Sequence, residues 1–173
     1  NMLWRGSAAD ARRMLDIVGD GPKALARARL ALQNLNKNVN ELIDAVPESL
    51  RSDAGLQYDR FTWRARKGRS ADAKTLLRDQ STSVEALGQP QAWSNRRRSL
   101  ARDEMRDGNP KLAYQLASKH FLTEGSAYAD LEWLSGYIAL RKLNDPATAL
   151  GHFLRFNKAI LSPISKGRAG YWI

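Results

Sequence analysis

The carboxylates of the chain are the side chains best suited to acid or base chemistry. Six glutamates occur, and a glutamate that protonates a sugar leaving group needs a pKa raised by burial. Of the six, only Glu132 lies inside a strongly apolar stretch, beside Trp133. We expect its carboxylate to be paired with an arginine on a packed helix, and we predict no catalytic residue.

Metal and cofactor chemistry finds little support. His120 and His152 lie far apart and form no His-Glu-x-x-His pair, and cysteine is absent. We expect His120 to cap or pack a helix end. The stretch Gly19-Asp-Gly-Pro-Lys23 lacks the Gly-Lys-Ser/Thr ending of a phosphate loop, and it indicates a turn that starts a helix. We predict no metal and no cofactor.

Basic residues gather in two clusters, within 60–69 and 96–106, and the net charge is +10. Such an excess favours nucleic acid, an anionic membrane surface or an acidic polymer, or it is simply a solvated basic surface. Asp103 and Asp107 lie within the second cluster, so part of its charge is expected in intramolecular pairs. The residues predicted to face a polyanion or glycan are Arg64, Arg66, Lys67, Arg98, Arg102 and Arg106.

The elements that carry these residues are predicted to be helices. Apolar residues recur at helical spacing between short Gly and Pro breaks, as in 91–107, 126–143 and 149–160. The segment 126–143 has two apolar stripes, which is typical of a helix covered on two sides. No window alternates with period two, and no apolar run reaches the length of a membrane span.

A weak internal repeat joins these helices. Breaks at Gly6, Gly68, Gly108 and Asn144 are each followed five positions later by alanine, a residue small enough for two helices to approach closely. The last three breaks are spaced about 36–40 residues apart, which is typical of helical solenoids. The sequence predicts an all-α fold, a tetratricopeptide-like α-solenoid or superhelix of stacked helical hairpins, over one domain at 1–173. An irregular helical bundle is the alternative.

Longer motifs lie in the second half of the chain. They are Ala113-Tyr-Gln-Leu-Ala-Ser-Lys-His120, Tyr128-Ala-Asp-Leu-Glu-Trp-Leu-Ser-Gly-Tyr-Ile-Ala-Leu-Arg141, Asp145-Pro-Ala-Thr-Ala-Leu-Gly-His-Phe153 and Ser162-Pro-Ile-Ser-Lys-Gly-Arg-Ala-Gly-Tyr-Trp172. In this order and spacing they resemble the noncatalytic helical domain of the soluble lytic murein transglycosylases. The resemblance extends over residues 40–173, and more loosely over the first 40.

The resemblance implies a helical superhelix in a periplasmic enzyme that cleaves the MurNAc–GlcNAc linkage of peptidoglycan and leaves 1,6-anhydromuramoyl ends. The family's catalytic glutamate stands in a Glu-Ser motif with a Gly-Leu-Met-Gln tract further on. Here the only such pair is Glu48-Ser49, and no such tract follows. The chain is therefore expected to be a noncatalytic segment of such an enzyme, and its ending on Gly170-Tyr-Trp-Ile173 suggests a truncated piece.

The implied partners are peptidoglycan, through the parent enzyme, and the parent's own catalytic domain, with another protein as a further possibility. Two alternatives differ in class. A free-standing tetratricopeptide-like module would share the fold and bind a protein. A nucleic-acid-binding protein would keep its clustered arginines unpaired and bind with strong salt dependence.

Overall fold

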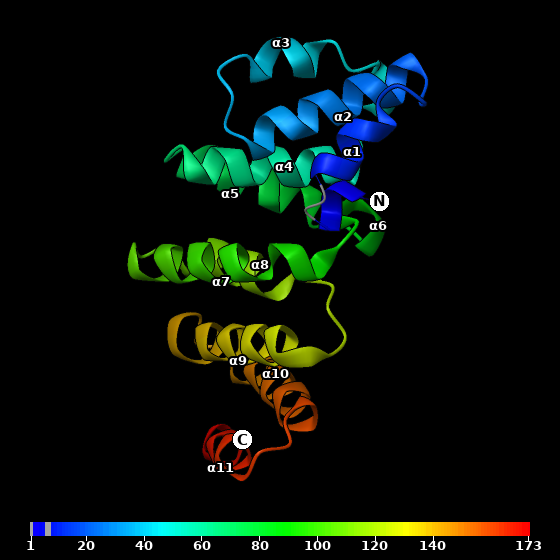
Figure 1. The fold of residues 1–173 in the computed structure, drawn as a ribbon. Coiled ribbons are helices and arrows are strands. Elements are labelled where there is room, and N and C mark those ends of the chain that lie inside the picture. The colour runs from blue at the N-terminus through cyan, green and yellow to red at the C-terminus, as the bar shows by residue number, and fades with distance from the viewer. Residues whose placement is uncertain (1, 6–7) are drawn as a thin grey trace. The chain divides into compact units, whose positions relative to one another are not determined.

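The computed structural model of the chain describes residues 2–5 and 8–173, and all the regular elements in these ranges are helices (Figure 1). The prediction of an all-α fold is confirmed. No helix in the described part is long and apolar enough to cross a bilayer. The chain divides into two compact units. Unit 1 comprises Asn1–Leu76 and Glu85–Gly88, and unit 2 comprises Leu77–Val84 and Gln89–Ile173.

Unit 1 is built around α2, which packs against α3 and α4. Its core joins Ala28 and Leu32 of α2 to Val39 and Leu56. Asp53 caps α4 by accepting a hydrogen bond from the Leu56 amide at 2.8 Å. The elements that lie wholly or mostly in this unit are η1 (Met2–Arg5), α1 (Ala8–Met14), α2 (Asp20–Gln33), α3 (Val39–Asp44), η2 (Glu48–Leu50), α4 (Ala54–Arg66), α5 (Ser70–Gln80) and α6 (Val84–Leu87).

In unit 2 each helix packs against the next one along the chain. The helix α7 packs against α8, both pack against α9, α9 packs against α10, and α10 packs against α11. Four of these helices begin with proline, whose fixed φ and missing N–H suit a first turn. The helices are α7 (Pro90–Arg106), α8 (Pro110–Ser118), α9 (Gly125–Lys142), α10 (Pro146–Ala159) and α11 (Pro163–Trp172).

The helix α9 is covered on two sides, as its two apolar stripes predict. One stripe is fully buried, namely Leu131, Leu134 and Ile138. On the other stripe, Trp133 stacks on Tyr137 with ring centroids 5.4 Å apart. Trp172 of α11 meets both rings edge-on, at 6.2 and 5.7 Å. The aromatic side chain near the end of the chain thus packs within unit 2.

The repeated breaks share one backbone geometry. Three of them adopt positive φ, at 73°, 81° and 55°, and these are Gly68, Gly108 and Asn144. This left-handed conformation ends a helix and costs least for glycine or asparagine. The alanines five positions later are at most 1% exposed, and these are Ala73, Ala113 and Ala149. The break at Gly6 lies outside the described residues. The local part of the repeat is confirmed, whereas stacking of the hairpins into a superhelix stays a prediction.

Candidate functional site

A buried cluster of charged and aromatic side chains surrounds Glu132 in the middle of α9. The carboxylate is 4% exposed, and its Oε2 lies 2.6 Å from Nδ1 of His152. The same oxygen accepts a hydrogen bond from Nε of Arg155 at 3.0 Å. Nε2 of His120 faces the other oxygen, Oε1, at 3.4 Å, which is longer than an ordinary hydrogen bond. Glu132 is therefore paired with an arginine, as expected, and with both histidines of the chain.

Three elements bring this cluster together. His152 and Arg155 are three residues apart on α10 and so share one face, while His120 lies in the connection between α8 and α9. Gly136, one turn beyond Glu132 on α9, permits the close approach of α10. A Cβ at this position would lie only 2.7 Å from Cε1 of Phe153. The missing side chain of Gly136 therefore sets the spacing at which Glu132 reaches His152.

Hydrogen positions follow from the partners. An ionised carboxylate only accepts, so Nδ1 of His152 carries the hydrogen that bonds to Glu132, and Nε2 accepts from the Tyr114 hydroxyl at 2.9 Å. The 2.7 Å approach of Arg155 Nη2 to the same Nδ1 is then a contact and not a hydrogen bond. In His120, Nδ1 accepts the Leu122 amide at 3.0 Å, so the ring hydrogen is on Nε2, facing Glu132.

The electrostatics hold Glu132 in its charged form. Burial alone raises the pKa of a carboxyl group. The hydrogen bonds from His152 and Arg155, with the N–H of His120 nearby, outweigh burial and lower the pKa of Glu132 well below its ordinary value of 4.5. A proton-donating glutamate needs the opposite shift. The cluster is thus an ion-pair network that holds its own side chains in fixed orientations.

Two ring nitrogens of this cluster are engaged by neighbouring groups. Within residues 2–5 and 8–173, no group of His, Asp and Glu side chains has an arrangement that could hold a metal ion. Nδ1 of His120 and Nε2 of His152 are already engaged by the Leu122 amide and the Tyr114 hydroxyl. The Arg155 guanidinium already supplies a cation to the carboxylate.

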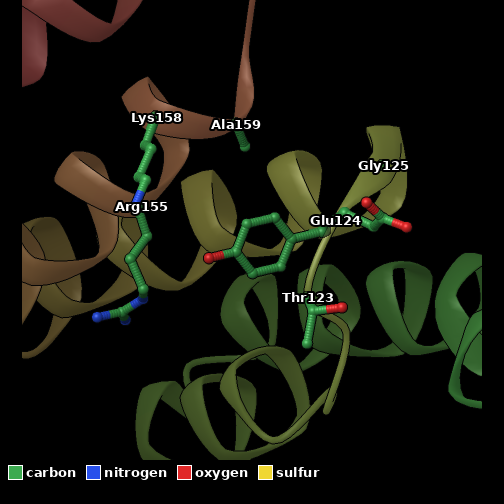
Figure 2. A pocket seen from close by; sticks show the side chains of 7 residues that line it. Thr123, Glu124, Gly125, Arg155, Lys158 and Ala159 are labelled. Carbon is green, nitrogen blue, oxygen red and sulfur yellow. The ribbon is translucent and has the colours of Figure 1, made fainter.

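A surface pocket of about 440 Å³ adjoins this network in unit 2. Figure 2 shows its labelled side chains: Arg155 and Lys158 come from α10, and Thr123 and Glu124 lie across from them, just before α9. Tyr128, which also lines it, meets the His120 ring edge-on at 5.6 Å. The residues that line the pocket are Thr123, Glu124, Gly125, Tyr128, Arg155, Lys158 and Ala159.

Arg155 belongs both to the network and to the pocket. Its Nε is bound to the buried Glu132, yet 48% of its side chain is exposed. The buried carboxylate of Glu132 therefore holds the guanidinium in place, while part of the Arg155 side chain faces solvent. Arg155 thus links the buried network of unit 2 to the surface pocket.

The predicted basic residues of unit 1 lie at the end of α4. Arg64 donates a hydrogen bond to the Asp72 carbonyl at 3.2 Å, and Arg66 donates one to the Gln33 carbonyl at 3.3 Å. Lys67 is exposed at the C-terminal cap of the helix. These positive charges suit the C-terminal end of a helix, where the backbone dipole is negative.

The predicted basic residues of unit 2 lie on α7, four residues apart, as their spacing indicates. Arg98 forms an ion pair with Asp130 of α9, and Arg106 forms one with Asp103. Arg102 is exposed and has no ion pair among the described residues. Part of this charge is thus neutralised within the chain, as the neighbouring aspartates predict.

Arg97 lies within the second basic cluster but is buried. Its side chain is 1% exposed and donates to the Leu116 carbonyl at 2.8 Å and to the Ser81 hydroxyl at 2.6 Å. Burial lowers the pKa of Arg97 to about 10, so the guanidinium remains charged at neutral pH. It faces the C-terminal end of α8, where carbonyls lack helical partners. Its role is structural.

The sequence pattern did not single out Arg155, Lys158 or Tyr128. The available signal was the spacing of His152 and Arg155, which places an imidazole and a guanidinium on one helix face. Their partner Glu132 is 20 residues from His152, so no local motif links them.

Comparisons of the chain with protein-family models, with curated proteins and with solved structures find no match.

Proposed function

We propose that this chain is a noncatalytic helical scaffold segment of a periplasmic lytic murein transglycosylase. In this proposal its hairpins stack as a tetratricopeptide-like superhelix, and its basic surface contacts peptidoglycan while the parent's catalytic domain cleaves the MurNAc–GlcNAc linkage. The observation that carries the proposal is that Glu132, the glutamate best placed by sequence for acid chemistry, is an ionised member of a buried network.

The motif that carries the resemblance has a packing role along α9. Within Glu132–Arg141, the glutamate anchors α10 through His152, Gly136 receives the Phe153 ring, and Ile138 is fully buried. A segment whose distinctive residues serve helix packing fits a scaffold better than a reaction centre. This supports an architectural role.

Charge supports contact with an acidic polymer. The chain has 28 Lys and Arg against 18 Asp and Glu, and murein peptides carry carboxylates. Such attraction assists capture without conferring much specificity, and it weakens with salt. Arg102 is the exposed charge on α7 best placed for it.

The test is co-sedimentation of the purified chain with isolated murein sacculi. We expect binding at low salt that weakens as salt rises, and no release of 1,6-anhydromuramoyl products. The variant Arg98→Gln/Arg102→Gln/Arg106→Gln should bind less murein than a control variant that loses the same amount of charge elsewhere. The control replaces three exposed lysines by glutamine, namely Lys37, Lys111 and Lys142.

Two results would overturn parts of this proposal. Release of anhydro products by the chain itself would show that it is catalytic. Equal loss of binding in the arginine variant and the lysine control would remove the α7 face as the murein surface. The parentage has its own test, because the proposal requires a Glu-Ser motif and a Gly-Leu-Met-Gln tract in the same reading frame.

A protein-binding module is the second candidate, and the exposed apolar side chains of the last segment favour it. Leu161 is 92% exposed, Ile164 88% and Tyr171 81%. Exposed apolar patches often mark protein contacts. Replacement of these three residues by serine should abolish binding to a protein partner and leave murein binding unchanged. The nucleic-acid alternative is weakened by the ion pairs of Arg98 and Arg106.

A further inference from the structure

The pocket between the start of α9 and the last turns of α10 has the features of a ligand site. We infer that it binds the carboxylate of a short peptide, with Arg155 and Lys158 as the cations that receive it. The nature of the peptide, a murein stem, rests on the proposed function. The binding chemistry rests on the pocket itself.

The two cations, Arg155 and Lys158, differ in whether another side chain already holds them in place. Arg155 is held in place by its bond to Glu132, and its Nη1 has no hydrogen bond among the described residues. A guanidinium already fixed loses less conformational freedom on binding and presents a planar donor edge to a carboxylate. Lys158, three residues along α10, is exposed and adds a second charge without an ion pair in the described part of the chain.

The start of α9 adds donors on the same pocket. The cap residue Glu124 makes no side-chain hydrogen bond to the helix, so it leaves the first amides uncapped. Gly125 has a φ of 89°, and a Cβ there would meet no heavy atom within 4 Å, so the backbone is open to a ligand. An uncapped N-terminus of an 18-residue helix favours a negative group.

The remaining lining selects among anions. Glu124 lies across the pocket from Arg155 and Lys158, and no described ion pair joins it to them (Figure 2). A carboxylate at that position disfavours a ligand of purely negative charge and favours one that also bears an amino group. Tyr128 contributes an aromatic wall. A peptide with a free carboxylate and a free amino group matches this set of groups.

The experiment is a calorimetric or NMR titration of the full chain with a synthetic stem tripeptide, L-alanyl-D-glutamyl-diaminopimelate. Lys158→Ala should weaken binding about three- to five-fold and Lys158→Glu about ten-fold, because each removes or reverses an exposed charge contact. Lys142→Ala removes the same charge from the opposite end of α9 and should change nothing. Equal affinities for Lys158→Ala and the parent chain would overturn the inference.

Three further probes identify the ligand chemistry. The tripeptide amidated at all three of its carboxyl groups should not bind. Acetylation of both of its amino groups, on the alanine and on the diaminopimelate side chain, should weaken binding in the parent chain and have less effect in Glu124→Gln. Peptide-free glycan strands, whose carboxylates are on the sugar, should not compete. Binding of the amidated peptide, or competition by the bare glycan, would contradict a peptide-carboxylate site.

The result separates the two proposals. Murein co-sedimentation without tripeptide binding would overturn the pocket inference and leave the scaffold proposal standing. Tripeptide binding without murein co-sedimentation would support the pocket and overturn the murein role.

Discussion

Two buried carboxylates in this chain are each paired with arginine, yet their pKa values move in opposite directions. In unit 1, burial raises the pKa of Asp59, although Arg29 donates to it at 2.7 Å and Gln33 at 3.0 Å. In unit 2, burial acts the same way on Glu132, but His120, His152 and Arg155 together outweigh it. The number and charge of the donors, and not burial alone, decide the protonation state.

Replacement of Glu132 by glutamine tests the strength of this network. The amide keeps the size of the side chain but loses the charge that His152 and Arg155 bind, so we expect a loss of about 1–3 kcal/mol in the free energy of unfolding. Urea denaturation measures it. The matched change Glu124→Gln, at an exposed glutamate of the same unit, should stay within about 0.5 kcal/mol. Similar effects of the two changes would contradict the network.

The variant Glu132→Gln also tests how the stability of the chain depends on pH. Since folding lowers the pKa of Glu132, the unfolded chain takes up a proton first as pH falls below about 4.5. The stability that Glu132 contributes is therefore present above that pH and is lost as pH falls towards its lowered pKa. Because Asp59 acts in the opposite sense, the measured quantity is the difference in the free energy of unfolding between the parent chain and Glu132→Gln. This difference should shrink from about pH 6 to about pH 3.5. A difference that does not change with pH would refute this.

At the scale of elements, two glycines serve two different purposes. Gly136 lies inside α9 and makes room for Phe153, so it sets the distance between two helices. Gly108 lies between α7 and α8 with a φ of 81° and open space around it, so it sets the backbone path of a break. The role of Gly136 therefore depends on side-chain packing, and the role of Gly108 depends on backbone conformation.

Gly136→Ala should destabilise the chain. Its methyl group would lie 2.7 and 2.9 Å from Cε1 and Cδ1 of Phe153, and overpacking of this kind costs about 1–3 kcal/mol, more than alanine gains in helix propensity. Thermal or urea unfolding checks it. Gly151→Ala on α10, where the nearest atom is 3.5 Å away, should be neutral or stabilising by up to about 1 kcal/mol. The double change Gly136→Ala/Phe153→Leu should recover part of the loss.

Gly108→Ala should also destabilise the chain, but through strain. A left-handed conformation costs an alanine about 1–2 kcal/mol, and no contact is disturbed. Gly167→Ala inside α11 also has open space around it and carries no such strain, so it should be neutral or stabilising. If both substitutions had the same effect on urea unfolding, the break would not depend on its backbone geometry.

At the scale of the molecule, each unit has its own core and its own buried arginine network. Arg29 in unit 1 binds Asp59 and lies over the Trp4 ring at 5.4 Å, while Arg97 in unit 2 binds Leu116 and Ser81. The chain divides into these two compact units. We expect local opening to follow the units.

Gly55→Ala tests this expectation, because a methyl group at Gly55 would overlap the Arg29 guanidinium. Native-state hydrogen exchange should speed up in α2 and α4 and stay unchanged in α9 and α10. Gly136→Ala should give the reverse pattern. Uniform acceleration across the chain in either variant would indicate a single cooperative unit.

The sequence by itself predicted the helices, the breaks at Gly68, Gly108 and Asn144, and the small alanine at a fixed offset after each break. These features depend on residues within one or two turns of one another, so spacing and residue type suffice to predict them. The expectation that Glu132 pairs with an arginine came from the same local reasoning, applied to a charge inside an apolar helix.

Only the tertiary structure decided which arginine pairs with Glu132, that both histidines join it, and that Arg155 and Lys158 line a pocket with the start of α9. Glu132 and Arg155 are 23 residues apart, and Arg98 and Asp130 are 32 apart. Arg97 has the same local pattern as its neighbours but is buried. Such pairings depend on which helix faces meet, and this is set by packing at positions such as Gly136 and not by the spacing of the charged residues themselves.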